Sequence, residues 1–150
     1  MKLTGKHIVN EVPSKVWEIL MDTHSLAKVV PGISSLEKLS DNSFKSTLNI
    51  KIGPVSGSFS GNLSLEDIVE QKSFTLKAKQ NSKIGNANAT IKIELAPVGD
   101  LQTAVAFDGD AHLAGQLASM GQRIIGGVSQ TLTKQFFSNL EKELELVNNG

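Results

Sequence analysis

Apolar and polar residues alternate with a period of two between residues 33 and about 112. The alternation is clearest over residues 44–52, 55–65 and 87–95, and turn residues such as Gly53-Pro54 separate the runs. A period of two places successive side chains on opposite faces of a β-strand. Strands that are joined by short turns and have one polar face are typical of an antiparallel meander.

The N-terminal segment predicts one strand followed by two short helices. Residues 3–11 have β-branched residues around a glycine and predict the strand. Pro13 suits the first turn of a helix, and the apolar residues that follow it recur at helical spacing. Asp22 and Thr23 are cap candidates for a second short helix, which runs to about Val30 before Pro31-Gly32 turns the chain.

Residues 113–147 predict one long helix, because apolar residues recur there every three or four positions. The apolar stripe consists of Leu113, Leu117, Met120, Ile124, Val128, Leu132, Phe136, Leu140 and Leu144. This helix is the only predicted element long enough to cover the apolar face of the sheet. We therefore predict a single α+β domain over residues 1–150, in which a curved antiparallel sheet wraps around a long C-terminal helix.

Charge and composition narrow the range of partners. Lys plus Arg and Asp plus Glu number 15 each, and Arg123 is the only arginine. This balance disfavours nucleic acid and anionic membrane surfaces as partners. The absence of cysteine excludes disulfides and thiolate chemistry. Because no apolar run has the length of a membrane span and the N-terminus lacks the apolar core of a signal peptide, we expect a cytoplasmic protein without an integral membrane segment.

Motifs for catalysis or for cofactor binding are absent. The sequence contains no G-x-S-x-G, P-loop or G-x-G-x-x-G motif. No histidine has a second histidine at ligand spacing among His7, His24 and His112. The predicted inward face of the sheet offers only Ser46, Gln80 and Thr103 as polar groups, and none of these is a good general acid or base. We therefore expect no enzymatic activity and no cofactor.

One polar cluster has the spacing of a metal site. Asp108, Asp110 and His112 alternate, so a strand would place them on one face, where they are suitable ligands for a divalent metal. Val105 and Phe107 point inward in the same pattern, however, which turns the aspartates toward solvent. A solvated polar face is the favoured interpretation, with metal binding as the alternative.

Small residues gather where a packed core would have large ones. On the strands and along the predicted helix they are Ser46, Gly57, Gly61, Ala78, Ala87, Ala89, Gly109, Ala114, Gly115, Ala118, Gly121, Gly126 and Gly127. Each glycine inside a helix costs about 1 kcal/mol relative to alanine. One interpretation is a hollow between the sheet and the first half of the helix. The alternative is that the glycines only permit close packing and bending of the sheet.

If the hollow exists, its walls are large apolar residues and it forms a binding pocket for an elongated apolar molecule. We predict that the ligand-binding residues are Leu48, Ile50, Gly57, Phe59, Gly61, Leu76, Ile91, Ile93, Val105, Phe107, Leu117, Met120, Gly121 and Ile124. A ligand that fills a void restores dispersion contacts that an empty cavity forfeits, which favours binding. Leucine in place of Gly61 or Gly121 should then fill the hollow and prevent binding.

Three stretches resemble a known family. They are Val30-Pro31-Gly32, the G-P-V-x-G-x-F-x-G run from Gly53 to Gly61, and the G-Q-L-A-S-M-G-Q-R-I-I run from Gly115 to Ile125 followed by Gln135-Phe136-Phe137. The chain resembles the CoxG family of carbon monoxide dehydrogenase subunits, within the START-like SRPBCC superfamily. The resemblance implies a helix-grip fold with two short helices after the first strand and a deep apolar cavity between the sheet and the long helix.

The resemblance also implies an accessory role beside a molybdenum hydroxylase of the CO dehydrogenase type, and some relatives in the family are associated with quinone. Our leading hypothesis is therefore a protein that binds a hydrophobic small molecule, such as a quinone or a lipid. The superfamily also includes cyclase-type and hydratase-type enzymes, so a small enzyme that uses the same cavity is one alternative. A pure interaction protein without a ligand is the other.

Overall fold

The computed structural model describes residues 1–149, with side chains described through residue 146. The elements in chain order are β1 (Lys2–Val9), α1 (Pro13–Met21), α2 (Thr23–Val29), β2 (Ile33–Ser40), β3 (Ser43–Ile52), β4 (Val55–Val69), β5 (Ser73–Ser82), β6 (Gly85–Val98), β7 (Gln102–Ala114), α3 (Gln116–Ser119) and α4 (Gln122–Asn149). In this part of the chain, seven strands form one sheet in the order β1-β7-β6-β5-β4-β3-β2. The predicted α+β fold with an antiparallel sheet is confirmed.

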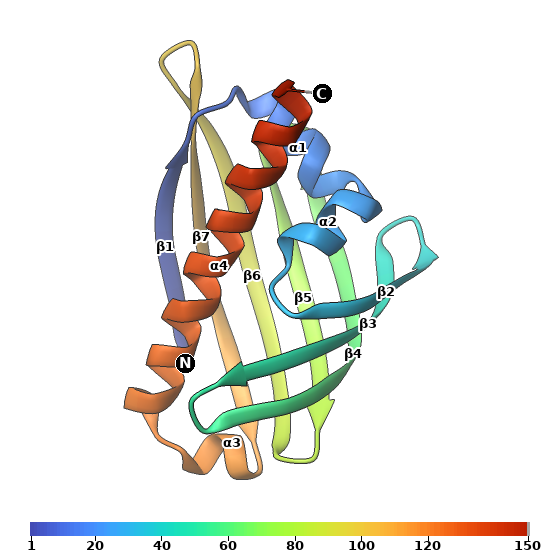
Figure 1. The fold of residues 1–150 in the computed structure, drawn as a ribbon, viewed down its shortest axis with the longest axis vertical. Coiled ribbons are helices and arrows are strands. Elements are labelled where there is room, and N and C mark those ends of the chain that lie inside the picture. Colours follow the sequence, from blue (N-terminus) through green and yellow to red (C-terminus); the bar gives the residue numbers. More distant parts are fainter. Residues whose placement is uncertain (150) are drawn as a thin grey trace.

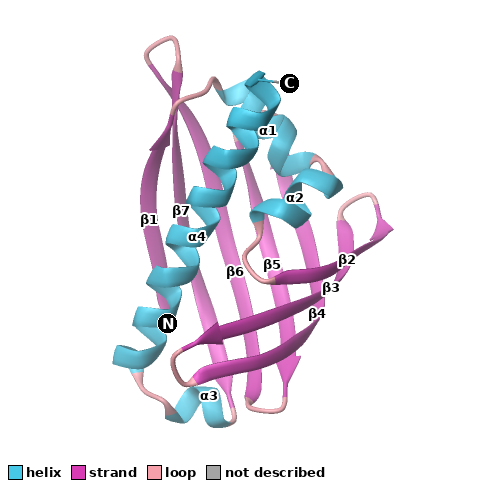
Figure 2. Cartoon of the chain, viewed as in Figure 1, coloured by secondary structure: helices cyan, strands magenta, loops and turns pink. Residues whose placement is uncertain are grey.

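The helices all lie on one side of the sheet (Figures 1 and 2). Helix α4 crosses this face along its length, and strands β3 and β4 bend around it toward its N-terminal end. A curved sheet needs such a cover, because its apolar face would otherwise be exposed to water. The arrangement places β1 at one edge of the sheet beside β7 and close to α4 (Figure 1).

The two short helices begin where the sequence predicts. Pro13 occupies the first turn of α1. The carboxylate of Asp22 accepts a hydrogen bond from the backbone N–H of Ser25 at 3.0 Å, which caps α2. This hydrogen bond lowers the pKa of the Asp22 carboxyl group from its ordinary value, because it stabilises the charged form.

We predicted one continuous helix from residue 113 for the C-terminal segment, and this prediction is wrong. Leu113 belongs to β7, where it pairs with Ala87 of β6, and the long helix begins only at Gln122. Gly115 and Gly121 flank the short helix α3 with φ angles of +71° and +85°, which glycine adopts without steric cost. These two glycines therefore lie at the ends of elements, and only Gly126 and Gly127 lie inside α4.

The core has two parts. The larger cluster joins α1 and α2 to the C-terminal half of α4, and its fully buried members include Val9, Val16 and Leu140. A smaller cluster around Phe59, Leu117 and Ile125 lies at the N-terminal end of α4. The predicted cavity occupies the space that adjoins both clusters.

An apolar cavity between the sheet and the C-terminal helix

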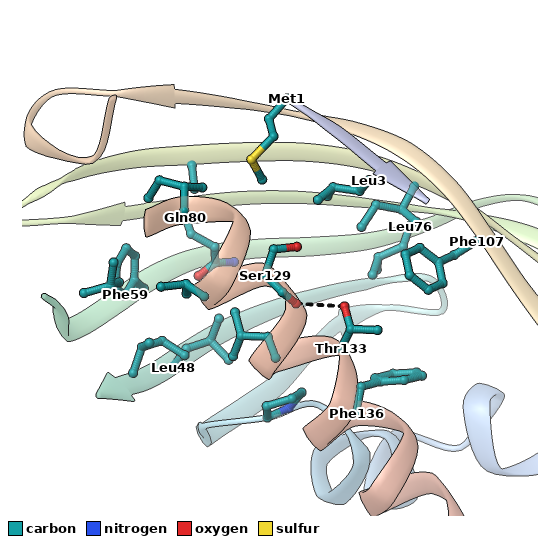
Figure 3. A pocket seen from close by; sticks show the side chains of 18 of the residues that line it. Met1, Leu3, Leu48, Phe59, Leu76, Gln80, Phe107, Ser129, Thr133 and Phe136 are labelled. Atoms are coloured by element: carbon teal, nitrogen blue, oxygen red, sulfur yellow. Dashed lines mark hydrogen bonds between the residues drawn. The ribbon is translucent and has the colours of Figure 1, made fainter. Parts of the chain in front are cut away.

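A cavity of about 370 Å³ lies between the concave face of the sheet and α4 (Figure 3). Its lining consists of Met1, Leu3, Pro31, Leu48, Ile50, Val55, Phe59, Leu76, Gln80, Ala87, Ile91, Ile93, Val105, Phe107, Leu113, Leu117, Ile125, Val128, Ser129, Leu132, Thr133, Phe136 and Phe137. Volume and lining are those of a site for a small hydrophobic molecule. The lining comes from both the sheet and the helix, so the cavity exists only when the helix lies on the sheet.

The sheet side of the cavity agrees with the sequence pattern. The predicted residues that line it are Leu48, Ile50, Phe59, Leu76, Ile91, Ile93, Val105 and Phe107 on the strands and Leu117 on α3. Strand alternation brings the strand residues together because each strand turns the same face inward. Their role in ligand binding stays a prediction.

The remaining predicted residues lie outside the cavity lining. Ile124 is 39% exposed, and its neighbour Ile125 lines the cavity in its place. The helix begins nine residues later than we predicted (122 rather than 113), and Met120 and Gly121 lie in the break before it. Ile124 and Ile125 precede Val128 by four and three positions, so helical spacing fits either of them, and the structure turns Ile125 inward.

The three predicted glycines do not line the cavity either. Gly57 and Gly121 are exposed, and a Cβ atom added at either of them would meet open space. A Cβ atom at Gly61 would instead collide with the backbone carbonyl of Lys79 on the neighbouring strand. Gly61 thus permits close approach of β4 and β5, and our expectation that a larger residue at this position would fill the void is wrong.

The cavity extends further along α4 than the sequence indicated. Leu132 and Phe136 line it, although we placed the hollow only at the first half of the predicted helix. Leu3 on β1 also lines it, and the alternation of Leu3, Gly5 and His7 was a usable signal for this strand. The small residue Ala87 was recognised as inward-facing, and it does line the cavity.

The polar groups of the lining are few. On β5, Gln80 is 5% exposed, and its Nε2 donates hydrogen bonds to Ser46 Oγ at 3.0 Å and to the Asn62 carbonyl oxygen at 3.4 Å. On α4, Thr133 Oγ1 donates to the Ser129 carbonyl oxygen at 2.8 Å (Figure 3). Neither an acidic nor a basic side chain lines the cavity within the described residues.

Other candidate chemistry lies on the outside of the fold. Asp108, Asp110 and His112 are exposed on β7, and no cluster suited to a metal ion occurs among the described residues. The third inward polar group, Thr103, is fully buried and donates to the Glu11 carbonyl oxygen at 2.6 Å. This hydrogen bond joins β7 to the segment before α1 and accounts for Thr103 structurally.

A second and more polar hollow runs along the outside, between β1 and α4. It shares Leu3, Phe107 and Phe137 with the cavity, so the two hollows adjoin along the edge of the sheet. His7 and Glu141 lie in this groove and contact each other.

The fold is that of the START-like proteins. A START superfamily protein from Mycobacterium smegmatis has a TM-score of 0.77 at 13% identity, over 97% of this chain and 98% of that chain. The Zhui aromatase/cyclase from Streptomyces sp. R1128 has a TM-score of 0.69 at 12% identity, over 97% of this chain and 93% of that chain. At these identities the likeness shows the fold alone.

Within this class, the chain belongs to the CoxG family of carbon monoxide dehydrogenase subunits, which it matches over residues 5–145. A conserved protein from Geobacillus kaustophilus has 30% identity and a TM-score of 0.93, over 97% of this chain and 95% of that chain. No curated protein matches the sequence. Of the helices described, none has both the length and the apolar character needed to cross a membrane.

Proposed function

We propose that this protein binds an elongated hydrophobic small molecule, such as a quinone or a lipid, in the cavity between the sheet and α4, and that it acts as a carrier and not as an enzyme. The observation that carries the proposal is the cavity itself, which is walled almost entirely by apolar side chains. Such a void forfeits dispersion contacts when it is empty, so its persistence favours an occupant.

The affinity expected from burial is moderate. At ~25 cal/mol per Å², burying about 300 Å² of ligand surface yields on the order of 7 kcal/mol before the costs of association are subtracted. The costs of lost translation and rotation reduce this gain, so micromolar affinity is the upper limit that burial alone supports. Micromolar affinity suits a carrier that must release its cargo.

The lining also supports a binding role over catalysis. General acid–base chemistry needs a titratable group within hydrogen-bond reach of the reacting atoms. The lining offers an amide and two hydroxyls instead, at Gln80, Ser129 and Thr133.

Ligand binding is tested by native mass spectrometry of the freshly purified protein, followed by titration with a decyl-substituted benzoquinone and with palmitate. We expect a bound apolar molecule or saturable binding of one probe. The variant Ala87→Leu places a larger side chain in the cavity and is expected to abolish binding while the protein still folds. Thr90→Leu, on the exposed face of the same strand, is the matched control. A parent protein that carries no molecule and binds neither probe contradicts the proposal.

Membership of the CoxG family supports a narrower proposal, in which the cargo is exchanged with a molybdenum hydroxylase of the CO dehydrogenase type. Quinone reduction by that enzyme from the same organism should become faster when this protein is added. The Ala87→Leu variant should give no acceleration, because it cannot hold the quinone. An equal rate with and without the parent protein rules this role out.

A further inference from the structure

The side chain of Gln80 lies in the middle of a row of small residues that crosses the sheet. Ser46 of β3 pairs with Gly61 of β4, Gly61 pairs with Gln80 of β5, and Gln80 pairs with Ala87 of β6. Because Gly61 has no side chain, the Gln80 amide reaches across β4 to Ser46, two strands away. The long polar side chain thus has small neighbours on both sides and lies on the wall of the cavity (Figure 3).

The hydrogen bonds of this amide fix its orientation. The Asn62 carbonyl oxygen only accepts hydrogen bonds, so the NH₂ group of Gln80 must face it. Reversing the amide would place two acceptor oxygens against each other. The Ser46 hydroxyl, which is 1% exposed, holds the same NH₂ group at 3.0 Å. A serine hydroxyl can also donate, so it is the Asn62 carbonyl that decides which end of the amide faces these two residues and directs the Oε1 atom away from them.

The Oε1 atom of Gln80 is buried and has no hydrogen-bond partner among the residues that the structure describes. A buried acceptor without a donor is destabilising, and such groups are rare in folded proteins. The destabilisation is avoidable, because an apolar residue at this position would continue the lining that surrounds it. A donor that arrives with the ligand accounts for this otherwise costly oxygen.

We propose that Gln80 Oε1 accepts a hydrogen bond from a hydroxyl group of the bound molecule, an inference that rests on the ligand-binding function proposed above. The cavity then selects apolar molecules that carry a hydroxyl donor, such as a long-chain alcohol, an alkylphenol or a hydroquinone. Molecules of the same shape that offer only acceptors, such as ethers or quinone carbonyls, bind less tightly. Since solvent does not reach Oε1, the ligand contacts it by displacing part of the flexible aliphatic lining.

If only the burial of apolar surface decided affinity, the ether would bind more tightly than the hydroxyl compound, so the two explanations can be tested against each other. An ether is more apolar than the phenol from which it derives, so a cavity that recognises only apolar surface binds the ether more tightly. The matched probes are para-hexylphenol and para-hexylanisole, and their dissociation constants are measured by isothermal titration calorimetry. We expect the parent protein to bind the phenol about tenfold more tightly than the ether.

Variants at Gln80 separate the effect of the Gln80 hydrogen bond from the effect of burial in the cavity. Gln80→Met has nearly the same shape without the amide, so it should still bind the ether but lose the preference for the phenol. Gln80→Met removes the hydrogen-bond partner of the buried Ser46 hydroxyl. If this variant folds poorly, the double variant Ser46→Ala/Gln80→Met, which also removes the hydroxyl, takes its place. Gln116→Met, at an exposed position on α3, is the control and should keep the parent preference.

Each outcome decides between the proposals. Equal binding of both probes, or tighter binding of the ether by the parent protein, overturns the proposed hydrogen bond to Gln80 Oε1. The proposal that the cavity binds apolar molecules still stands in that case. A preference for the phenol that survives in Gln80→Met overturns the assignment to this residue. Failure of both probes to bind the parent protein overturns the binding function and the anchor together.

Discussion

His7 Nε2 lies 2.6 Å from Glu141 Oε1, which joins the edge strand β1 to helix α4 across 134 positions of the sequence. A carboxylate only accepts hydrogen bonds, so the imidazole nitrogen donates here. The ring of His7 also stacks on Phe137, with the ring centroids 4.6 Å apart. His7 therefore links β1 to α4 by a polar contact with Glu141 and an aromatic contact with Phe137.

Removal of His7 should destabilise the fold more than removal of Glu141. Glu141→Ala loses one half-exposed polar pair, which is worth roughly 0.2–1 kcal/mol. His7→Ala loses the same pair and also the stacking on Phe137, which adds about 0.5–1.5 kcal/mol. The free energy of unfolding in urea measures both effects. Equal losses in the two variants would show that the stacked ring contributes nothing.

The cap of α2 should make stability depend on pH. Because Ser25 lowers the pKa of Asp22 in the folded protein, the ionised carboxylate stabilises the fold. This contribution is fully present above the ordinary aspartate pKa of about 3.9, and it is lost as the pH falls through the lower folded pKa. Asp22→Ala should cost about 1 kcal/mol at neutral pH.

Asp22→Asn is the matched variant, because asparagine is an equally good cap without a titrating group. It should keep most of the stability at neutral pH and should lose less stability than the parent protein between pH 5 and pH 2 (approximate limits from the aspartate pKa). Urea unfolding across this range gives the measurement. Parallel pH profiles for the parent and Asp22→Asn would exclude Asp22 as a source of the acid sensitivity.

The sheet could be predicted from the sequence because its strands have one apolar and one polar face. Alternation identifies Leu48 and Ile93 as inward-facing whatever their partners are, and both line the cavity. The helix side of the cavity was harder to predict, because Leu113 and Leu117 fit a helical stripe although strand β7 ends between them at Ala114. Ile124 and Ile125 both fit the helical spacing to Val128, so the pattern alone did not decide between them, and the structure turns Ile125 inward.

The polar features of the cavity depend on partners that are distant in the sequence. Gln80 was recognised as an inward polar residue, but its unpaired oxygen depends on Ser46, which is 34 positions away. The pairing of β3 with β4 and of β4 with β5 sets this contact, and no local pattern encodes that register. The close approach of Lys79 to Gly61 has the same origin.

The two glycines inside α4 should be replaceable with a gain in stability. A Cβ atom at Gly126 or Gly127 would meet open space, so close packing does not account for these glycines. Gly126→Ala and Gly127→Ala should each stabilise the protein by about 0.5–1 kcal/mol, because alanine loses less conformational entropy in a helix. Gly121→Ala is the contrast, since its φ angle of +85° strains any other residue. Thermal unfolding followed by far-ultraviolet circular dichroism compares the three. A loss of stability in both helical variants would mean that the positions are more crowded than the structure shows.

Gly61→Ala should destabilise the protein and also loosen the Gln80 amide. The added Cβ atom meets the Lys79 backbone carbonyl, so β4 and β5 must move apart, at a cost of about 2 kcal/mol or more. The same movement separates Gln80 from Ser46, because Gly61 lies between them in the sheet. Ser60→Ala, at the exposed neighbouring position, should change the free energy of unfolding by less than about 0.5 kcal/mol. If Gly61→Ala unfolds at the same urea concentration as Ser60→Ala, the strands do not need glycine at this crossing. The hollow between the sheet and the helix, which the sequence indicated, would then be the better explanation for the small residue.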